Sequence, residues 1–133
     1  RYGVYGIVAR KDNTEICLVQ APNGAYFLPG GEIESGEDHK KALVRELHEE
    51  LGAKAKLGKF LGQADEYFYS SHPDTYYYNP AYIYETACYE VLGAPLDDIN
   101  HIDWFPVETA IKKLKRGSHK WGVAAWQDYL NAL

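Results

Sequence analysis

The sequence predicts a single α+β domain arranged as an α/β/α sandwich, and two observations lead to that class. Runs rich in apolar and aromatic residues are separated by turn residues, while residues 38–51 carry apolar side chains at helical spacing. Residues 107–130 then read as two closing helices. A chain with this order of strands, helix, strands and helices is expected to fold in layers. With 133 residues it is long enough for one hydrophobic core, so we expect a single domain over residues 1–133.

The N-terminal part of the chain predicts a β-hairpin. Residues 2–9 and 15–20 are apolar enough for strands, and the Asp-Asn pair between them favours a turn because such side chains bond to nearby backbone. A short apolar run at residues 26–28 follows a second turn. That run ends at the Pro-Gly-Gly sequence of residues 29–31, which interrupts any regular element.

The clearest predicted helix covers residues 38–51. Three leucines that start at Leu43 recur at i, i+4 and i+8, which places them on one face toward the core. Ser35 is the predicted N-terminal cap of this helix. Gly52 suits the left-handed position that commonly ends a helix.

The rest of the chain predicts further strands and then helices. Three strands are expected at residues 56–69, 76–92 and 99–105, with a loop at 70–75. Two closing helices, separated by Gly117, are expected at residues 107–116 and 118–130.

Composition and charge exclude several classes of protein. The net charge of −5 argues against a nucleic-acid coat protein, and no apolar run approaches the length of a transmembrane helix. Cys17 and Cys88 lie in apolar surroundings, so we expect small buried side chains and a cytoplasmic location. The chain has no methionine and opens inside an apolar alternation, so we expect the native product to extend further at its N-terminus.

The most informative segment is acidic and covers residues 31–53, with the sequence GEIESGEDHKKALVRELHEELGA. Glu46, Glu49 and Glu50 lie at i, i+3 and i+4, so a helix places them side by side. Three like charges at this spacing destabilise a bare helix by about 0.2–0.5 kcal/mol per pair. A divalent cation would turn that cost into a binding site, because Mg²⁺ prefers carboxylate oxygens as ligands.

The spacing within this segment carries a specific pattern. Gly31 is followed after five residues by Glu37, after seven more by Arg45-Glu46-Leu47, and after one more by Glu49-Glu50-Leu51-Gly52-Ala53. This pattern resembles the signature of the Nudix hydrolases (MutT-related proteins) at every specified position, with small Ala53 where a bulkier aliphatic residue is usual. The order of elements in the rest of the chain is also similar to that family's fold, a mixed β-sheet between helices with a loop–helix–loop catalytic motif.

The resemblance implies a Mg²⁺- or Mn²⁺-dependent pyrophosphohydrolase. Such an enzyme cleaves a phosphoanhydride in a nucleoside diphosphate linked to another group, for example a nucleoside triphosphate or a dinucleotide. Independently of the family, an acidic site repels an anionic pyrophosphate unless cations intervene. A bound cation can polarise the phosphoryl oxygen, and a free carboxylate nearby can take the proton of the attacking water.

Site residues are implied by carrying the family's signature onto this chain. Glu49 and Glu50 are implied metal ligands, and Glu46 is a further ligand or the base for water. The carbonyl oxygen of Gly30 is another implied ligand. Arg45 and Glu37 are implied to form an ion pair that orients the glutamates.

Several residues outside the signature leave alternatives open. Asp65, Glu66 and Glu85 are outside candidates for a base or an additional ligand, although solvated surface positions are expected for each. The tyrosine-rich residues 66–84 could stack on a nucleobase or pack on a sheet. The basic cluster within residues 112–120 could attract a polyphosphate or form a solvated helix face.

Two rival functions also stay open. One is a nucleotide-sensing module that keeps the fold without turnover, and the other is an RNA end-processing pyrophosphohydrolase supported only by the basic cluster. The expected partner is a small-molecule nucleotide, with no membrane and with nucleic acid disfavoured by the net charge. The spacing of residues does not decide between a monomer and a homodimer.

Overall fold

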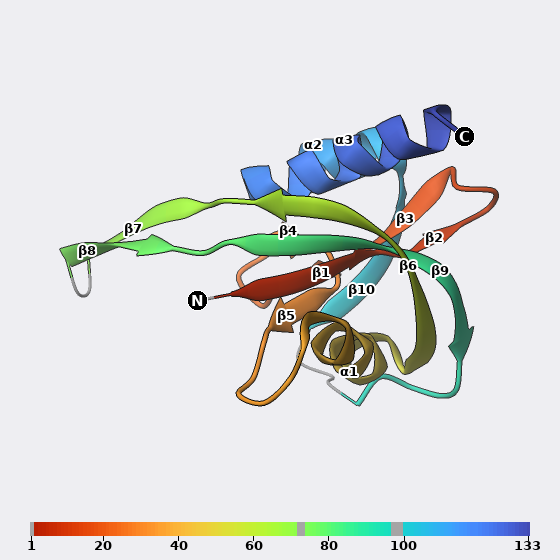
Figure 1. Cartoon of the computed structure of the whole chain (residues 1–133), viewed down its shortest axis with the longest axis horizontal. Coiled ribbons are helices and arrows are strands. Elements are labelled where there is room, and N and C mark those ends of the chain that lie inside the picture. Colours follow the sequence, from red (N-terminus) through yellow and green to blue (C-terminus); the bar gives the residue numbers. More distant parts are fainter. Residues whose placement is uncertain (1, 72–73, 97–99) are drawn as a thin grey trace.

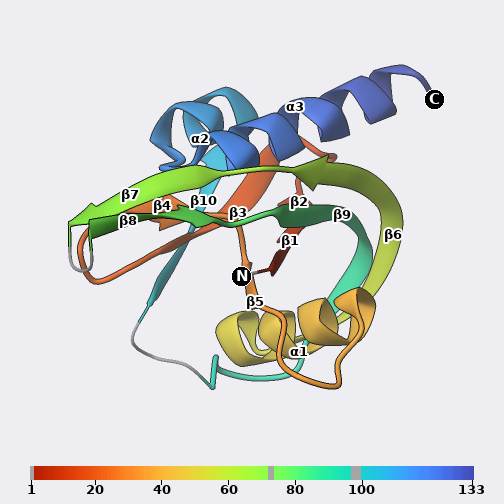
Figure 2. The same ribbon diagram turned by 60° about the vertical axis from the view of Figure 1, so that its left-hand side comes forward.

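The computed structural model describes residues 2–71, 74–96 and 100–133, and it places helices on both sides of β-sheets (Figures 1 and 2). The strands are β1 Gly3–Ile7, β2 Ala9–Arg10, β3 Glu15–Gln20, β4 Tyr26–Phe27, β5 Gly30–Glu32, β6 Ala53–Ala64, β7 Tyr67–Ser71, β8 Asp74–Tyr78, β9 Ala81–Val91 and β10 His101–Pro106. The helices are α1 His39–Leu51, α2 Val107–Lys113 and α3 Gly117–Asn131. The predicted α+β class is confirmed.

Three sheets organise the described strands. The first has the order β5-β1-β9-β6, and it is mixed because β1 pairs parallel with β9 while its other pairs are antiparallel. The second has the order β10-β3-β2, with β4 added to β3. The third is the two-stranded pair β7-β8. The N-terminal strand joins the first two sheets, since the chain leaves β1 at Ile7 and enters β2 at Ala9.

Several predicted boundaries were wrong, for identifiable reasons. The expected strand at residues 56–69 begins earlier, at Ala53, and divides into β6 and β7. The expected strand at residues 76–92 divides at Asn79 and Pro80, where proline supplies no N–H for a ladder. Gly117 does not separate the closing helices but is the first residue of α3.

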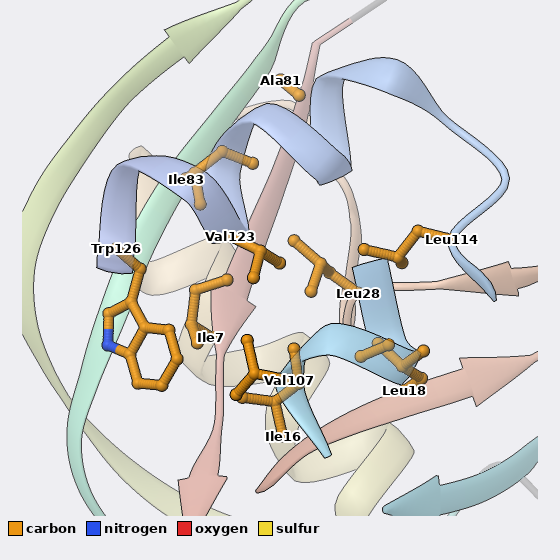
Figure 3. Packing of buried hydrophobic residues seen from close by; sticks show 11 residues of the cluster. Ile7, Ile16, Leu18, Leu28, Ala81, Ile83, Val107, Leu114, Val123 and Trp126 are labelled. Carbon is orange, nitrogen blue, oxygen red and sulfur yellow. The ribbon is translucent and has the colours of Figure 1, made fainter. Parts of the chain in front are cut away.

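Alternation along the strands sends neighbouring side chains into two different core layers. Ile7 packs with Val123 and Trp126 of α3 in the layer under α2 and α3, which Figure 3 shows in close-up. Val8, the next residue, packs with Leu43 of α1 in the other layer. Because successive side chains of an extended segment point to opposite faces, the junction between β1 and β2 supports both helical layers.

The ends of α1 show why this helix starts and stops where it does. Asp38, not the predicted Ser35, is the N-cap, and its Oδ1 accepts the N–H of Lys41 at 2.8 Å. Gly52 ends the helix as predicted, with a left-handed φ of 64°. Leu43 and Leu47 are fully buried, as their spacing predicts. The expectation of two buried cysteines was half right, since Cys17 is buried and Cys88 is exposed.

A buried histidine joins α3 to the chain segment before β5. His119 is completely buried, and its Nδ1 accepts the backbone N–H of Leu28 at 3.0 Å. Burial, followed by the nearby charge of Arg116, lowers the pKa of His119 to about 3. The imidazole is therefore neutral in the fold at neutral pH. Among the described residues, no helix is long and apolar enough to cross a membrane.

His119 is expected to make the free energy of unfolding depend on pH. Its pKa rises from about 3 in the fold to 6.5 in the unfolded chain, so the unfolded state takes up a proton as the pH falls below 6.5. Relative to the variant His119→Gln, the native chain should lose up to about 1.4 kcal/mol of stability per pH unit in that range. Urea titrations of both proteins from pH 7 to pH 4.5 test this, and parallel curves would contradict it.

Candidate active site

Two glycines allow β5 to lie close to the carboxylates of α1. Gly30 has a φ of 147°, and a Cβ there would lie 2.1 Å from the carbonyl oxygen of Val4 on the neighbouring strand. A Cβ on Gly31 would lie 2.6 Å from the carboxyl group of Glu46. Any larger residue at either position would therefore push β5 away from β1 or from α1.

Glu50 and Glu46 both lie against this glycine pair. Glu50 is only 9% exposed, and its Oε1 accepts the backbone N–H of Gly30 at 2.7 Å. Glu46 approaches the next residue, Gly31. The i, i+4 spacing in α1 thus places two carboxylates over one short segment of backbone.

Arg45 is the cation that holds the acidic segment together. Its Nε and Nη2 donate to the two carboxylate oxygens of Glu37 at 2.6 and 3.0 Å. Its Nη1 donates to Glu46 at 3.0 Å and to Glu49 at 3.3 Å. Nη2 also reaches the carbonyl oxygen of Glu32, at 3.3 Å. Since the guanidinium group has a fixed fork of donors, these contacts set the positions of several carboxylates at once.

The surroundings change the acidity of two of these carboxyl groups in opposite directions. The side-chain hydrogen bond from Arg45 lowers the pKa of Glu37. Burial raises the pKa of Glu46, and the nearby Arg45 opposes that rise only in part. Glu37 is therefore held firmly as a carboxylate, whereas Glu46 is a better proton acceptor than an exposed glutamate.

The donor set matches the chemistry of a hard divalent cation. Glu46, Glu49 and Glu50 offer carboxylate oxygens, which Mg²⁺ and Mn²⁺ prefer to nitrogen or sulfur ligands. Over residues 2–71, 74–96 and 100–133, no three His, Cys, Asp or Glu side chains are grouped closely enough to hold a metal as they stand. Glu46 and Glu49 are turned toward Arg45, and Glu50 toward the amide of Gly30.

A pocket of about 140 Å³ opens beside Glu50. Aromatic and aliphatic side chains form much of its wall, and Arg116 and Asn100 supply polar groups. Its lining residues are Tyr5, Val19, Ala21, Phe27, Leu28, Gly30, Gly31, Glu50, Asn100 and Arg116. Nothing in the sequence indicated Tyr5 or Asn100, whereas Arg116 belongs to the basic cluster that could attract a polyphosphate. A wider and more open hollow of about 560 Å³ lies on another side of α1, over Lys40, Val44 and His48.

The outside candidates have other partners. Asp65 accepts hydrogen bonds from Gln63 and Tyr78, at 3.0 and 2.9 Å. Glu85 accepts the N–H of Lys59 at 3.4 Å. The Glu66 carboxylate accepts both the N–H and the hydroxyl of Ser118, at 3.0 and 2.9 Å, so it stabilises the start of α3 rather than lying on the solvated surface. None of these hydrogen bonds involves Glu46 or Glu50.

Comparison with known families agrees with this geometry. The NUDIX domain model matches residues 1–127. The chain belongs to the Nudix family. The signature segment of this Nudix domain is therefore the segment that forms β5, the following loop and α1.

Curated relatives of this Nudix domain include phosphohydrolases. The human protein named diphosphoinositol polyphosphate phosphohydrolase NUDT4B is 36% identical over 106 residues, which cover 76% of this chain and 55% of the relative. A bovine protein named diphosphoinositol polyphosphate phosphohydrolase 3-beta is 34% identical and is covered over 60% of its length. The chain therefore spans little more than half the length of these relatives.

Solved structures show the same fold. The E. coli ORF135 protein has a TM-score of 0.73 at 24% identity, covering 98% of this chain and 91% of that one. The MutT Nudix hydrolase from Burkholderia pseudomallei has a TM-score of 0.70 at 22% identity, with 94% and 96% covered. At these identities the likeness concerns the arrangement of sheets and helices.

Arg45 is expected to stabilise the fold most strongly near neutral pH. Arg45→Gln leaves Glu37, Glu46 and Glu49 facing one another, which should lower the free energy of unfolding by about 1–2 kcal/mol at pH 7.5. The loss should shrink as the pH falls below about 4.5, because protonation removes the repulsion in the variant and also releases Glu37 from Arg45 in the native chain.

Arg45→Lys is the matched control for that experiment. It keeps the positive charge and removes only the fork of donors, so its loss of stability should be smaller. Denaturant titrations at pH 7.5 and pH 4 provide the comparison. An Arg45→Gln effect that is the same at both pH values would contradict the ionic role of Arg45.

Proposed function

We propose that this Nudix domain hydrolyses a phosphoanhydride bond in a nucleotide, with a divalent cation bound by the signature carboxylates. The observation that carries the proposal is the meeting of Glu46 and Glu50 over Gly30 and Gly31 at the edge of a pocket. Family membership and the names of the curated relatives support the reaction class.

Different residues of the chain would accept the proton and position the carboxylates. Water attacks phosphorus, a new P–O bond forms, and the bond from phosphorus to the bridging oxygen breaks, so that the leaving phosphate departs with that oxygen. The proton of the attacking water passes to a carboxylate, for which Glu46 is the candidate. Arg45 and Glu37 position the carboxylates, because they fix α1 against the loop before it.

Glu49, Glu50 and the carbonyl oxygen of Gly30 would hold the cation, Mg²⁺ or Mn²⁺, with Glu46 as a further ligand where another carboxylate is the base. When bound, such a cation polarises a phosphoryl oxygen and lowers the pKa of a bound water. Glu46 and Glu49 pair with Arg45 in this structure, so each would have to turn from Arg45 to serve as a ligand.

The pocket beside Glu50 favours a nucleotide over a diphosphoinositol polyphosphate. Its volume of about 140 Å³ and the rings of Tyr5 and Phe27 suit a flat, uncharged base. Arg116 is the cation of its lining and Glu50 the anion. An inositol ring crowded with phosphates would need several cations around it. The names of the curated relatives nevertheless make that compound the second candidate.

A substrate panel tests the proposal directly. Nucleoside triphosphates, dinucleoside polyphosphates, a capped or triphosphorylated RNA and a diphosphoinositol polyphosphate are each incubated with the protein and Mg²⁺ or Mn²⁺. We expect turnover of a nucleotide, and a loss of about 100-fold or more in kcat/KM for Glu50→Gln. Glu108→Gln, which changes an exposed glutamate in the first turn of α2, should leave the rate unchanged.

The outcomes separate the rival functions. If calorimetry shows tight nucleotide binding and no substrate is turned over, the protein is a nucleotide-sensing module and not an enzyme. Turnover of RNA alone, with a steep dependence on salt, would favour RNA end processing. If Glu50→Gln is as active as the native chain, the signature carboxylates do not carry the reaction.

Gly31→Ala is expected to impair catalysis through the position of Glu46. The added methyl group would lie 2.6 Å from the Glu46 carboxyl group, so that side chain must move. We expect kcat to fall at least about tenfold. Gly93→Ala is the control, because a Cβ at Gly93 meets no described atom within 4 Å. Unchanged kcat in Gly31→Ala would show that this close approach has no catalytic role.

A further inference from the structure

The basic cluster near the C-terminus sends one of its cations into the pocket beside Glu50. Its members are Lys112, Lys113, Lys115, Arg116 and Lys120. The four lysines are exposed, whereas Arg116 is partly buried and lines the pocket. The carbon at the centre of its guanidinium group lies 5.5 Å from the ring centroid of Phe27. Such stacking uses the flat face of the guanidinium group and not its N–H donors.

The backbone on both sides of Arg116 is tied to the segment that carries the stacked ring. The N–H of Lys115 donates to the carbonyl oxygen of Tyr26 at 2.9 Å. On the other side, Nδ1 of His119 accepts the N–H of Leu28 at 3.0 Å. Because the stacked phenylalanine lies between Tyr26 and Leu28 in the sequence, these two hydrogen bonds hold it and Arg116 in register. The contact is therefore preorganised by backbone on both sides.

A carboxylate from a distant part of the chain fixes the start of α3. This helix begins directly after Arg116, whose side chain makes no capping hydrogen bond. Glu66 accepts both the N–H and the hydroxyl of Ser118 instead, at 3.0 and 2.9 Å. Since Ser118 is buried and lies two residues after Arg116, this contact also limits the movement of the arginine backbone.

The signature alone leaves a phosphate site short of positive charge. Glu46, Glu49 and Glu50 are acidic, and a phosphoanhydride brings further negative charge. Arg45 cannot balance it, because its guanidinium group already donates to three carboxylates and a backbone carbonyl oxygen of the same segment. A divalent cation offsets only part of the charge, so a second cation in the pocket would stabilise a bound phosphate.

The effect on Tyr5 shows that Arg116 and Glu50 act on the same part of the pocket. Burial raises the pKa of Tyr5, the charge of Arg116 opposes that rise, and the charge of Glu50 adds to it. Both charged side chains therefore lie near one hydroxyl group. One substrate molecule in the pocket can then be near the signature carboxylate and Arg116 together.

We infer that Arg116 binds a phosphate group of the substrate that the divalent cation does not hold. This role rests on the proposed function and extends substrate binding to a residue outside the signature. Among the lining residues that the structure describes, Arg116 is the cation, so the pocket suits one such phosphate and not a ring of several.

Steady-state kinetics on the substrate that the panel identifies test this role. Arg116→Gln should raise KM about 10- to 100-fold and change kcat less than about threefold, because a phosphate contact made equally in substrate and transition state contributes to binding alone. Arg116→Lys should recover part of the loss, since lysine keeps the charge. Lys112→Gln is the matched control, because it removes an exposed cation of the same cluster and should leave KM unchanged.

Binding of inorganic pyrophosphate in EDTA separates this role from the proposed function, because it needs neither a divalent cation nor turnover. In an NMR titration, pyrophosphate should shift the amide signals of Gly30 and Gly31, and Arg116→Gln should weaken this binding about tenfold or more. No binding to the native chain, equal binding to Arg116→Gln, or an unchanged KM would overturn the inference. So would a loss that Arg116→Lys does not reduce, because the side chain would then act only through its packing on Phe27.

Discussion

The structure around the signature depends on one guanidinium group. Arg45 contacts Glu37 from the loop, Glu46 and Glu49 from its own helix, and the backbone of β5 through Glu32. Without a cation at this point, the acidic residues of one short segment would repel one another and the loop would have no fixed position on α1. Half-burial makes the contacts stronger than those of a surface ion pair.

Local features of the fold were predictable because they depend on residues close in sequence. The helical spacing of Leu43 and Leu47, the glycine that ends α1 and the pattern of glutamates all act within one or two turns. The division at Asn79 and Pro80 had a local signal in the proline, whereas the register shifts between β6 and β9 had none. Such irregularities arise from pairing between distant segments, which a single strand's composition does not encode.

The same contrast between local and long-range features explains which parts of the site could be predicted. The spacing of Glu46, Glu49 and Glu50 predicted the carboxylate cluster, because a helix by itself brings these positions together. The pocket beside Glu50 draws Tyr5 from β1, Phe27 from β4 and Arg116 from the segment before α3. Only the folded chain brings these residues together. Family membership therefore agrees with the reaction class that the signature predicts, whereas the residues that line the pocket carried no comparable pattern in the sequence.

The hydrogen bond between His119 and Leu28 joins residues 91 positions apart. It fastens α3 to the strand region that leads into the signature, without touching the carboxylates themselves. The chemistry of the site is thus encoded in one continuous stretch of the gene, whereas the walls of the pocket are encoded in several separate stretches. Under the proposed function, substitutions in α3 or in the segment before it change the pocket beside Glu50 and leave the signature carboxylates intact.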